Sequence, residues 1–277
     1  MNRMVAKLSL VSWNIARKQA AWRELRANTS VDVALVQEGI PPEEGLLIES
    51  VPASAAPWQT VGGKRTFCAA IARLSDRVAL HQVEHSGLAE AGEGVFAVSR
   101  TGSLSVADVT CADGERITVV SMYAAWERAR GGKLLYADGS AHRLISDLCF
   151  LLDSQRGHKV IAAGDLNIYF GHGENGSAYW RDRYSTVFSR MAAIGLPFVG
   201  PQYPNGWQAD PWPPHLPPDS KNVPTFRTRQ SDPASASYQL DFVFASPELR
   251  DRLTVTALNS ASAWGPSDHC RVLIEMR

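Results

Sequence analysis

Short apolar runs that end in polar residues recur along most of the chain. Each of them predicts a buried or half-buried strand, and they lie at 8–13, 31–36, 67–74, 78–83, 95–99, 159–163, 238–245 and 270–276. Two more runs, at 104–110 and 116–122, flank Asp113-Gly114, a residue pair that favours a hairpin turn. Apolar residues at helical spacing predict helices, which lie at 20–27, 144–152 and 177–194.

One segment stands apart from this pattern. Residues 197–224 hold nine of the sixteen prolines. Such a segment cannot form a regular helix or a central strand. Because strands are predicted on both sides of it, we interpret it as a long ordered surface loop, not as a boundary between domains. The chain is accordingly expected to form a single domain over residues 1–277.

Polar residues cluster where the predicted strands end or begin. They form the groups Trp13-Asn14, Gln37-Glu38, Gly164-Asp165-Leu166-Asn167, Gln239-Leu240-Asp241 and Ser267-Asp268-His269. Their side chains include carboxylates, carboxamides and an imidazole, which are the groups that a hard metal ion and a phosphate require. The sequence therefore predicts a site for phosphate chemistry at the ends of strands.

Individual members suit particular tasks in such a site. Glu38 could bind Mg²⁺, which prefers a few carboxylates and keeps several waters. The spacing of Asp165 and Asn167 places both side chains on one face of an extended backbone, where one accepts a proton from water and the other orients that water. His269 could donate a hydrogen bond to a phosphoryl oxygen while Asp241 holds its other ring nitrogen. Taken singly, each residue also has a structural explanation, such as a turn or a half-buried histidine.

Composition limits the possible partners. Hydrophobic residues are 45% and charged residues 20% of the chain, as in a globular enzyme with a large core. The formal net charge of zero provides no global attraction to nucleic acid or to an anionic membrane. No apolar run reaches the ~18 residues that cross a bilayer, and no signal peptide or CxxC pair is evident. We expect a cytoplasmic protein with reduced cysteines and no membrane partner.

Basic residues are nevertheless concentrated locally near the polar groups. Arg128 and Arg130 lie in one basic segment, and Arg227 lies in another. Together with Trp264, they are candidates to contact a polynucleotide backbone and to stack on its bases. Ordinary solvated charge is an equal alternative for the arginines.

The ordered set of motifs resembles the endonuclease/exonuclease/phosphatase superfamily, which includes deoxyribonuclease I, exonuclease III, sphingomyelinases and inositol-polyphosphate phosphatases. The resemblance covers residues 8–276, and it rests on the five polar groups above together with Tyr123. It implies an α/β fold, a four-layer sandwich of two facing mixed β-sheets flanked by helices. Segments far apart in the sequence would then meet at one site.

The resemblance also implies a role for each motif residue. It assigns Asn14, Glu38 and Asp268 to the neighbourhood of a bound Mg²⁺ or Mn²⁺. Asp165 would activate the attacking water, and Asn167 would help to position water and phosphate. Tyr123 would contact the phosphate. His269, oriented by Asp241, would stabilise the charge of the transition state.

The leading hypothesis is a metal-dependent phosphodiesterase that hydrolyses nucleic acid, with DNA favoured. The alternative is an enzyme for a small or lipid phosphoester of the inositol phosphate or sphingomyelin type. The Pro-Asn pair that commonly follows the tyrosine in exonuclease III-like enzymes is replaced by Ala124-Ala125-Trp126, which puts abasic-site repair in doubt. A catalytically dead scaffold is disfavoured by the intact polar set. The sequence does not decide the oligomeric state, for which a monomer is the default expectation.

Overall fold

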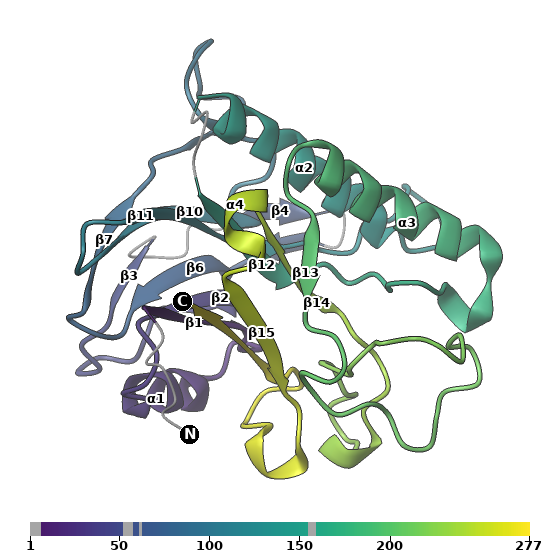
Figure 1. Ribbon diagram of the computed structural model, residues 1–277. Coiled ribbons are helices and arrows are strands. Elements are labelled where there is room, and N and C mark those ends of the chain that lie inside the picture. The colour runs from purple at the N-terminus through teal and green to yellow at the C-terminus, as the bar shows by residue number, and fades with distance from the viewer. Residues whose placement is uncertain (1–6, 52–57, 61–62, 155–158) are drawn as a thin grey trace.

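Two six-stranded mixed sheets lie face to face, with helices on both outer faces (Figure 1). The computed structural model describes residues 7–51, 58–60, 63–154 and 159–277. The first sheet has the strand order β15 (Leu253–Leu258), β16 (Arg271–Met276), β1 (Leu8–Asn14), β2 (Val33–Gly39), β6 (Cys68–Arg73) and β3 (Glu49–Val51). The second has the order β13 (Phe198–Gly200), β14 (Asp241–Ala245), β12 (Val160–Asp165), β11 (Arg116–Tyr123), β10 (Leu104–Cys111) and β7 (Val78–Gln82).

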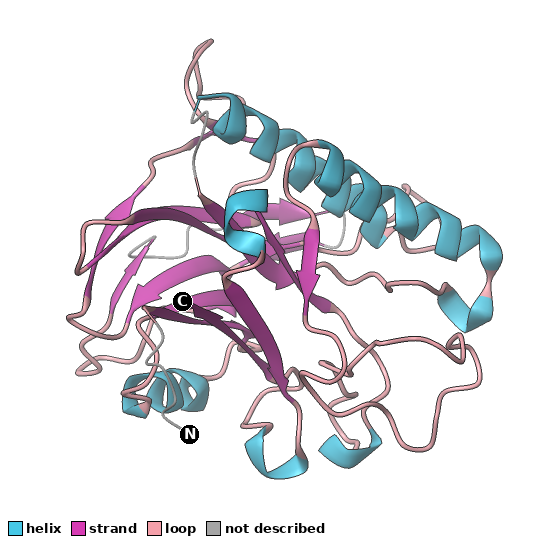
Figure 2. Cartoon of the chain, viewed as in Figure 1, coloured by secondary structure: helices cyan, strands magenta, loops and turns pink. Residues whose placement is uncertain are grey.

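The helices complete four layers. Helix α1 (Gln19–Ala27) packs on the outer face of the first sheet, while α2 (Ala137–Ser154) and α3 (Ala178–Ala193) run side by side over the second (Figure 2). This confirms the four-layer sandwich that the resemblance implied. None of the helices in the described part of the chain is long and apolar enough to cross a lipid bilayer. Smaller elements are β4 (Trp58–Thr60), β5 (Gly63–Arg65), β8 (Ser86–Gly87), β9 (Ala97–Val98), α4 (Pro247–Arg250) and the 3-10 helices Glu174–Gly176, Pro233–Ser235 and Ala261–Ala263.

Central strands are buried on both faces, which explains why they read as continuous apolar runs. In β1, Leu8 and Leu10 belong to the core between the two sheets, whereas Val11 and Trp13 belong to the core under α1. Successive side chains of a strand point to opposite faces, so a strand between two cores needs apolar residues at both parities. Polar groups are then most easily accommodated at the strand ends.

Each main sheet contains a single parallel strand pair among its described strands, and this pair lies in the middle of the sheet. The pairs are β1 with β2 and β11 with β12, and the other pairings in both sheets are antiparallel. Parallel neighbours end at the same edge of a sheet. Four carboxyl-terminal strand ends are thereby available to build one site.

The proline-rich loop is held in place by two buried amide side chains. Gln239 accepts a hydrogen bond from the Val223 backbone N–H at 3.1 Å and donates one to the Pro201 carbonyl at 2.9 Å. Asn259 accepts from the Trp207 N–H at 2.9 Å and donates to the carbonyl of the same residue at 2.8 Å. The first residues of this segment form the edge strand β13, which the sequence-based interpretation as a loop did not include. The rest of the segment is ordered in part by these side chains from the sandwich.

Both sheets are joined through a carboxylate at the end of the sandwich away from the strand ends just described. Glu115, before β11, accepts two hydrogen bonds from Arg252, both at 2.8 Å, and also pairs with Lys7 and Lys159. Arg252 and Lys7 precede strands of the first sheet, whereas Lys159 precedes β12 of the second. The Arg252 guanidinium, with help from both lysines, holds the pKa of Glu115 well below its ordinary value.

We expect Glu115→Gln to lower the free energy of unfolding at neutral pH by about 1.5–3 kcal/mol, the range for hydrogen bonds to charged groups. A carboxylate whose pKa is depressed by folding stabilises the protein above its unfolded pKa of about 4.3, and this stability is lost as the pH falls through the folded value. The gap between wild type and variant should therefore shrink in acid. Urea unfolding at about pH 7 and pH 3 measures it. Glu90→Gln, at an exposed position, is the control, and a gap that is independent of pH would contradict the assignment.

Candidate active site

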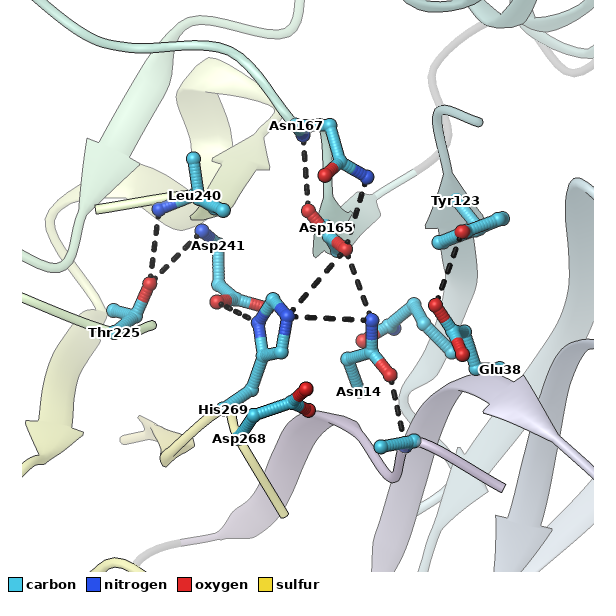
Figure 3. Close-up of polar contacts among 12 residues, drawn as sticks. Asn14, Glu38, Tyr123, Asp165, Asn167, Thr225, Leu240, Asp241, Asp268 and His269 are labelled. Atoms are coloured by element: carbon cyan, nitrogen blue, oxygen red, sulfur yellow. Dashed lines mark hydrogen bonds and ion pairs between the residues drawn. The ribbon is translucent and has the colours of Figure 1, made fainter. Parts of the chain in front are cut away.

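The strand ends converge on one cluster of polar side chains (Figure 3). Asn14 ends β1, Tyr123 ends β11 and Asp165 ends β12. Strand pairing places Asp165 opposite Tyr123 on one side and opposite Asp241 on the other. His269 lies immediately upstream of β16, the antiparallel neighbour of β1. All five residues are buried, and Tyr123 is the most accessible of them at 9% exposure.

Asp165 is held by amide groups from both sheets. Its Oδ2 accepts hydrogen bonds from Asn14 Nδ2 at 2.9 Å and from Asn167 Nδ2 at 3.1 Å, while its Oδ1 accepts from the Asn167 backbone N–H at 2.9 Å. Burial raises the pKa of Asp165 above its ordinary value, although the positive charge of His269 and these donors act in the opposite direction. The result is a carboxylate of increased basicity in a fixed orientation.

His269 and Asp241 form a hydrogen-bonded pair beside Asp165. Nδ1 of His269 lies 2.8 Å from Asp241 Oδ2, which leaves Nε2 facing Asp165 Oδ2 at 3.8 Å. Thr225 Oγ1 accepts the backbone N–H groups of Leu240 at 3.0 Å and of Asp241 at 3.1 Å, and so fixes the start of β14. Burial alone would lower the pKa of His269, but the Asp241 and Asp165 carboxylates outweigh it and raise that pKa. The raised pKa favours the imidazolium form, in which Nε2–H can act as a donor.

Glu38 forms a second part of the site. It has a left-handed φ of 47° in an irregular stretch where the pairing of β2 with β6 shifts register. A residue other than glycine adopts this backbone conformation only where the surroundings enforce it. Tyr123 Oη donates to Glu38 Oε1 at 3.1 Å, and Arg17 Nε lies 3.2 Å from Oε2. Burial raises the pKa of Tyr123 well above its ordinary value, so its hydroxyl remains a donor.

The donor set fits an ion that keeps much of its hydration. Asn14, Glu38 and Asp268 offer two carboxylates and one carboxamide, the ligand chemistry of Mg²⁺. In the part of the chain that the structure describes, no three His, Cys, Asp or Glu side chains come close enough to form a complete protein cage. Asp268 is half-buried, and its Oδ2 lies 3.5 Å from Arg229 Nε. This arrangement suits magnesium better than a structural zinc ion, which needs about four protein ligands.

The three arginines predicted to contact the substrate differ in exposure and in their partners. Arg128 and Arg130 are exposed in the segment after β11, outside the buried cluster. Arg227 donates from Nη1 to the Ser231 carbonyl at 2.8 Å and from its backbone N–H to the Asp268 carbonyl at 2.9 Å, so it braces the loop at Asp268.

The expectation that Trp264 stacks on a base is wrong. Its side chain is 1% exposed and packs with Val223, Ala257 and Cys270 in a small core. A base cannot reach an indole ring that is covered on both faces. Trp264 instead supports the loop that carries Ser267 to His269.

Several supporting residues had no role assigned from the sequence. Ser267 Oγ donates to the Asn14 carbonyl at 2.6 Å and accepts from the His269 backbone N–H at 3.2 Å, which joins two parts of the site. Arg17 and Arg65 both place their guanidinium groups over the ring of Phe67, at 5.3 and 5.8 Å from its centroid. The signal for Arg17 was its place three residues after Asn14; the pairing with Phe67 depends on tertiary structure.

A pocket of about 530 Å³ opens beside this cluster. Asn167 and Leu240, which flank the reacting groups in sequence, form part of its wall, as does Phe226, whose ring centroid is 4.9 Å from that of His269. Much of the remaining wall is aromatic, and its rings are those of Trp126, Tyr169, Trp180, Tyr184 and Tyr238. The site thus combines a cluster of buried polar side chains with a neighbouring pocket lined largely by aromatic rings.

Comparison by sequence gives no relative of this chain. No model of a known protein family matches it, and no sequence of a curated protein does.

Solved structures, in contrast, resemble it over nearly its full length. The endonuclease domain of TRAS1, a telomere-specific non-LTR retrotransposon, has a TM-score of 0.61 and 18% identity over 98% of both chains. An AP endonuclease, LMAP from Leishmania major, has a TM-score of 0.59 and 14% identity over 98% of this chain and 87% of its own. A 3'-5' exonuclease, NExo from Neisseria meningitidis, has a TM-score of 0.55 and 16% identity over 97% and 99%.

At such low identity the likeness concerns the fold, and it agrees with the layer order described above. The chain has a deoxyribonuclease I-like fold.

Proposed function

We propose that this protein is a divalent-metal-dependent phosphodiesterase that hydrolyses nucleic acid by direct attack of an activated water. The observation that carries the proposal is the hydrogen-bonded cluster of Asn14, Asp165, Asn167, Asp241 and His269 at the strand ends. The cluster supplies a base, Asp165, and a hydrogen-bond donor, His269, for one phosphoryl centre. The fold that carries it resembles those of an endonuclease domain and of a 3'-5' exonuclease. The strands of both sheets contribute, so we infer one catalytic domain.

Asp165 acts as the general base. Its raised pKa brings its basicity closer to neutrality, which makes proton transfer from water more favourable. Asn14 and Asn167 hold the carboxylate so that the accepting oxygen points to one place. The proton released by the attacking water passes to Asp165 as the new phosphorus–oxygen bond forms. The bond from phosphorus to the leaving sugar oxygen breaks, and that oxygen takes a proton from solvent water.

His269 stabilises the charge that develops on the phosphoryl oxygens. Its Nε2–H faces the centre because Asp241 binds Nδ1, so no rotation is needed when the charge appears. Tyr123 and Asn167 lie beside the centre, where their donors bind Glu38 and Asp165 in this structure. To contact a phosphate, they would exchange those hydrogen bonds for bonds to its oxygens. A bound Mg²⁺ or Mn²⁺, held by Glu38, Asn14 and Asp268, would supply neutralisation of the phosphate charge.

The aromatic pocket favours a nucleic-acid substrate over a small polyphosphorylated one. Aromatic walls stack on bases, whereas an inositol phosphate needs several cations around it. Lys133 is the single basic residue among those that line the pocket, and Glu174 adds a negative charge. Arg128 and Arg130 remain candidates to contact the polynucleotide backbone. DNA is the favoured polymer.

A substrate panel tests the proposal. Single-stranded DNA, duplex DNA, RNA, inositol phosphates and sphingomyelin should be incubated with Mg²⁺, Mn²⁺ or EDTA. We expect metal-dependent cleavage of a polynucleotide that EDTA abolishes. Turnover of only a small or lipid phosphoester would replace the nuclease proposal with the alternative.

Glu38→Gln should weaken Mg²⁺ binding by at least about 10-fold and reduce cleavage with it, because the neutral amide is a poorer ligand than a carboxylate. Calorimetric titration of the metal measures the affinity without any substrate. Glu44→Gln, at an exposed position nearby in sequence, is the matched control. Equal Mg²⁺ affinity in wild type and Glu38→Gln would remove Glu38 from the metal neighbourhood.

Asp165→Asn should lower kcat by roughly 10²–10⁴-fold, the contribution of a positioned acid or base. His269→Ala should lower it by about 10²–10³-fold, as for loss of a preorganised donor. Both changes should affect KM much less, because the interactions strengthen in the transition state. His81→Ala, at an exposed position on β7, is the control, and near-normal turnover by His269→Ala would refute the mechanism.

Combining Asp241→Asn with His269→Ala should cost little more than His269→Ala alone, because Asp241 acts through the ring that it orients. Asp241→Asn by itself should be milder than His269→Ala. Steady-state kinetics of the two single variants and the double variant complete the cycle. Fully additive losses would show that the two residues act independently.

A further inference from the structure

Two wall residues of the aromatic pocket also contact the proposed reacting centre. Asn167 forms part of its wall and donates to Asp165 Oδ2 at 3.1 Å. Phe226, another wall residue, forms an isolated antiparallel bridge with His269. A phosphate bound beside Asp165 and His269 would therefore place the neighbouring nucleotide of the substrate next to the pocket.

Aromatic rings form much of the pocket wall, and they differ in how far they are open to a ligand. The rings of Tyr169 and Tyr238 stack on each other with centroids 5.4 Å apart, and each also stacks on a histidine, His172 or His215. Their faces are thus largely occupied within the protein. Trp126, also in the wall, is 53% exposed. Its indole ring is available to stack on a planar aromatic group.

Glu174 gives the pocket a directional polar group. Tyr184 Oη donates to Glu174 Oε1 at 2.9 Å, and Tyr169 also hydrogen-bonds to this carboxylate, so its orientation is fixed. An ionised carboxylate only accepts hydrogen bonds, and its two oxygens have about four acceptor sites, which leaves sites beyond those that the two tyrosines use. A ligand that fits here must stack on the aromatic wall and present hydrogen-bond donors toward Glu174. An anionic group would be repelled.

Among the bases, guanine meets both requirements best. Its N1–H and exocyclic amino group are adjacent donors on one edge, so they can pair with both oxygens of a carboxylate. Adenine and cytosine present one amino group beside an acceptor nitrogen. Thymine and uracil present a single N–H between two carbonyl oxygens, which a carboxylate repels.

We propose that the pocket binds one unstacked nucleobase next to the scissile phosphate, and that Glu174 selects guanine at that position. This inference rests on the proposed function, since it assigns the base specificity of the same site. Flipped bases in other enzymes are read in the same physical way, by stacking and by hydrogen bonds to the base edge. A good two-bond contact to a base gives a preference of roughly 5- to 150-fold.

Binding of mononucleotides tests the pocket without catalysis. Guanosine and uridine 5'-monophosphates contain no phosphodiester, so their binding can be followed in EDTA through the fluorescence of Trp126 and Trp180. We expect guanosine monophosphate to bind more tightly, with a ratio that Glu174→Gln brings close to one. Trp126→Ala should weaken both nucleotides, because it removes the exposed stacking surface, and the binding of this variant is followed through Trp180. Asp182→Asn, which removes a negative charge from α3 at an exposed position, should leave the ratio unchanged.

Cleavage of a randomised single-stranded oligonucleotide then tests the specificity. Mapped products should show guanine enriched at one fixed position beside the cut, and Glu174→Gln should lose this enrichment while it still cleaves. Guanosine selectivity without any polynucleotide cleavage would overturn the proposed function and leave the base pocket standing. Polynucleotide cleavage with equal binding of both mononucleotides and no base preference would overturn the pocket proposal and leave the nuclease standing.

Discussion

The need to bury both faces of both central sheets governs this molecule. Strands such as β1 and β11 lie between two apolar cores, where an unpaired charge would be strongly destabilising. Polar side chains are therefore concentrated at the strand ends, where turns and loops can supply partners. One parallel pair in each sheet aligns two such ends, and the facing of the sheets brings the four ends together.

Contacts between the sheets then convert proximity into a defined geometry. Gln37, which is fully buried, donates from β2 to Ser121 Oγ of β11 at 3.0 Å, and Ser121 donates to the Val36 carbonyl at 2.8 Å. Asn14 reaches from the first sheet to Asp165 of the second. The charge of Asp165 is thus positioned by a residue of the opposite sheet, so the reacting geometry depends on how the sheets are docked.

Much of the fold and of the polar cluster could be predicted from the sequence because burial on both faces leaves long apolar runs with polar ends. Strand β15 was not predicted from the sequence because it is half-exposed and leaves no continuous apolar run. Only Val255 and Ala257 of its six residues are buried. Helix α2 begins seven residues before the predicted 144, since Ala137 and Ala141 pack on the second sheet although Asp138 and Gly139 weaken the local helical signal.

The aromatic surfaces show the limit of such reasoning. Trp264 lies near Asp268 and His269 in sequence, which suggests a stacking role, yet it fills a core with Val223 and Cys270. Trp126, Tyr169, Trp180 and Tyr238 come from separate segments, and nothing in their spacing shows that they share a pocket. Whether an aromatic ring is core or binding surface depends on what tertiary packing leaves uncovered.

The position of β16 makes the polar cluster depend on residues from both ends of the described sequence. β16 lies between β15 and β1, so a strand from the first residues of the sheet is paired with one from the last. Trp13 Nε1 donates to the His269 carbonyl at 2.9 Å across 256 residues of sequence. Loss of the β1–β16 pairing would therefore free His269 from its place while most of the second sheet stayed paired, so local opening at this edge would disable the cluster before the sandwich unfolds.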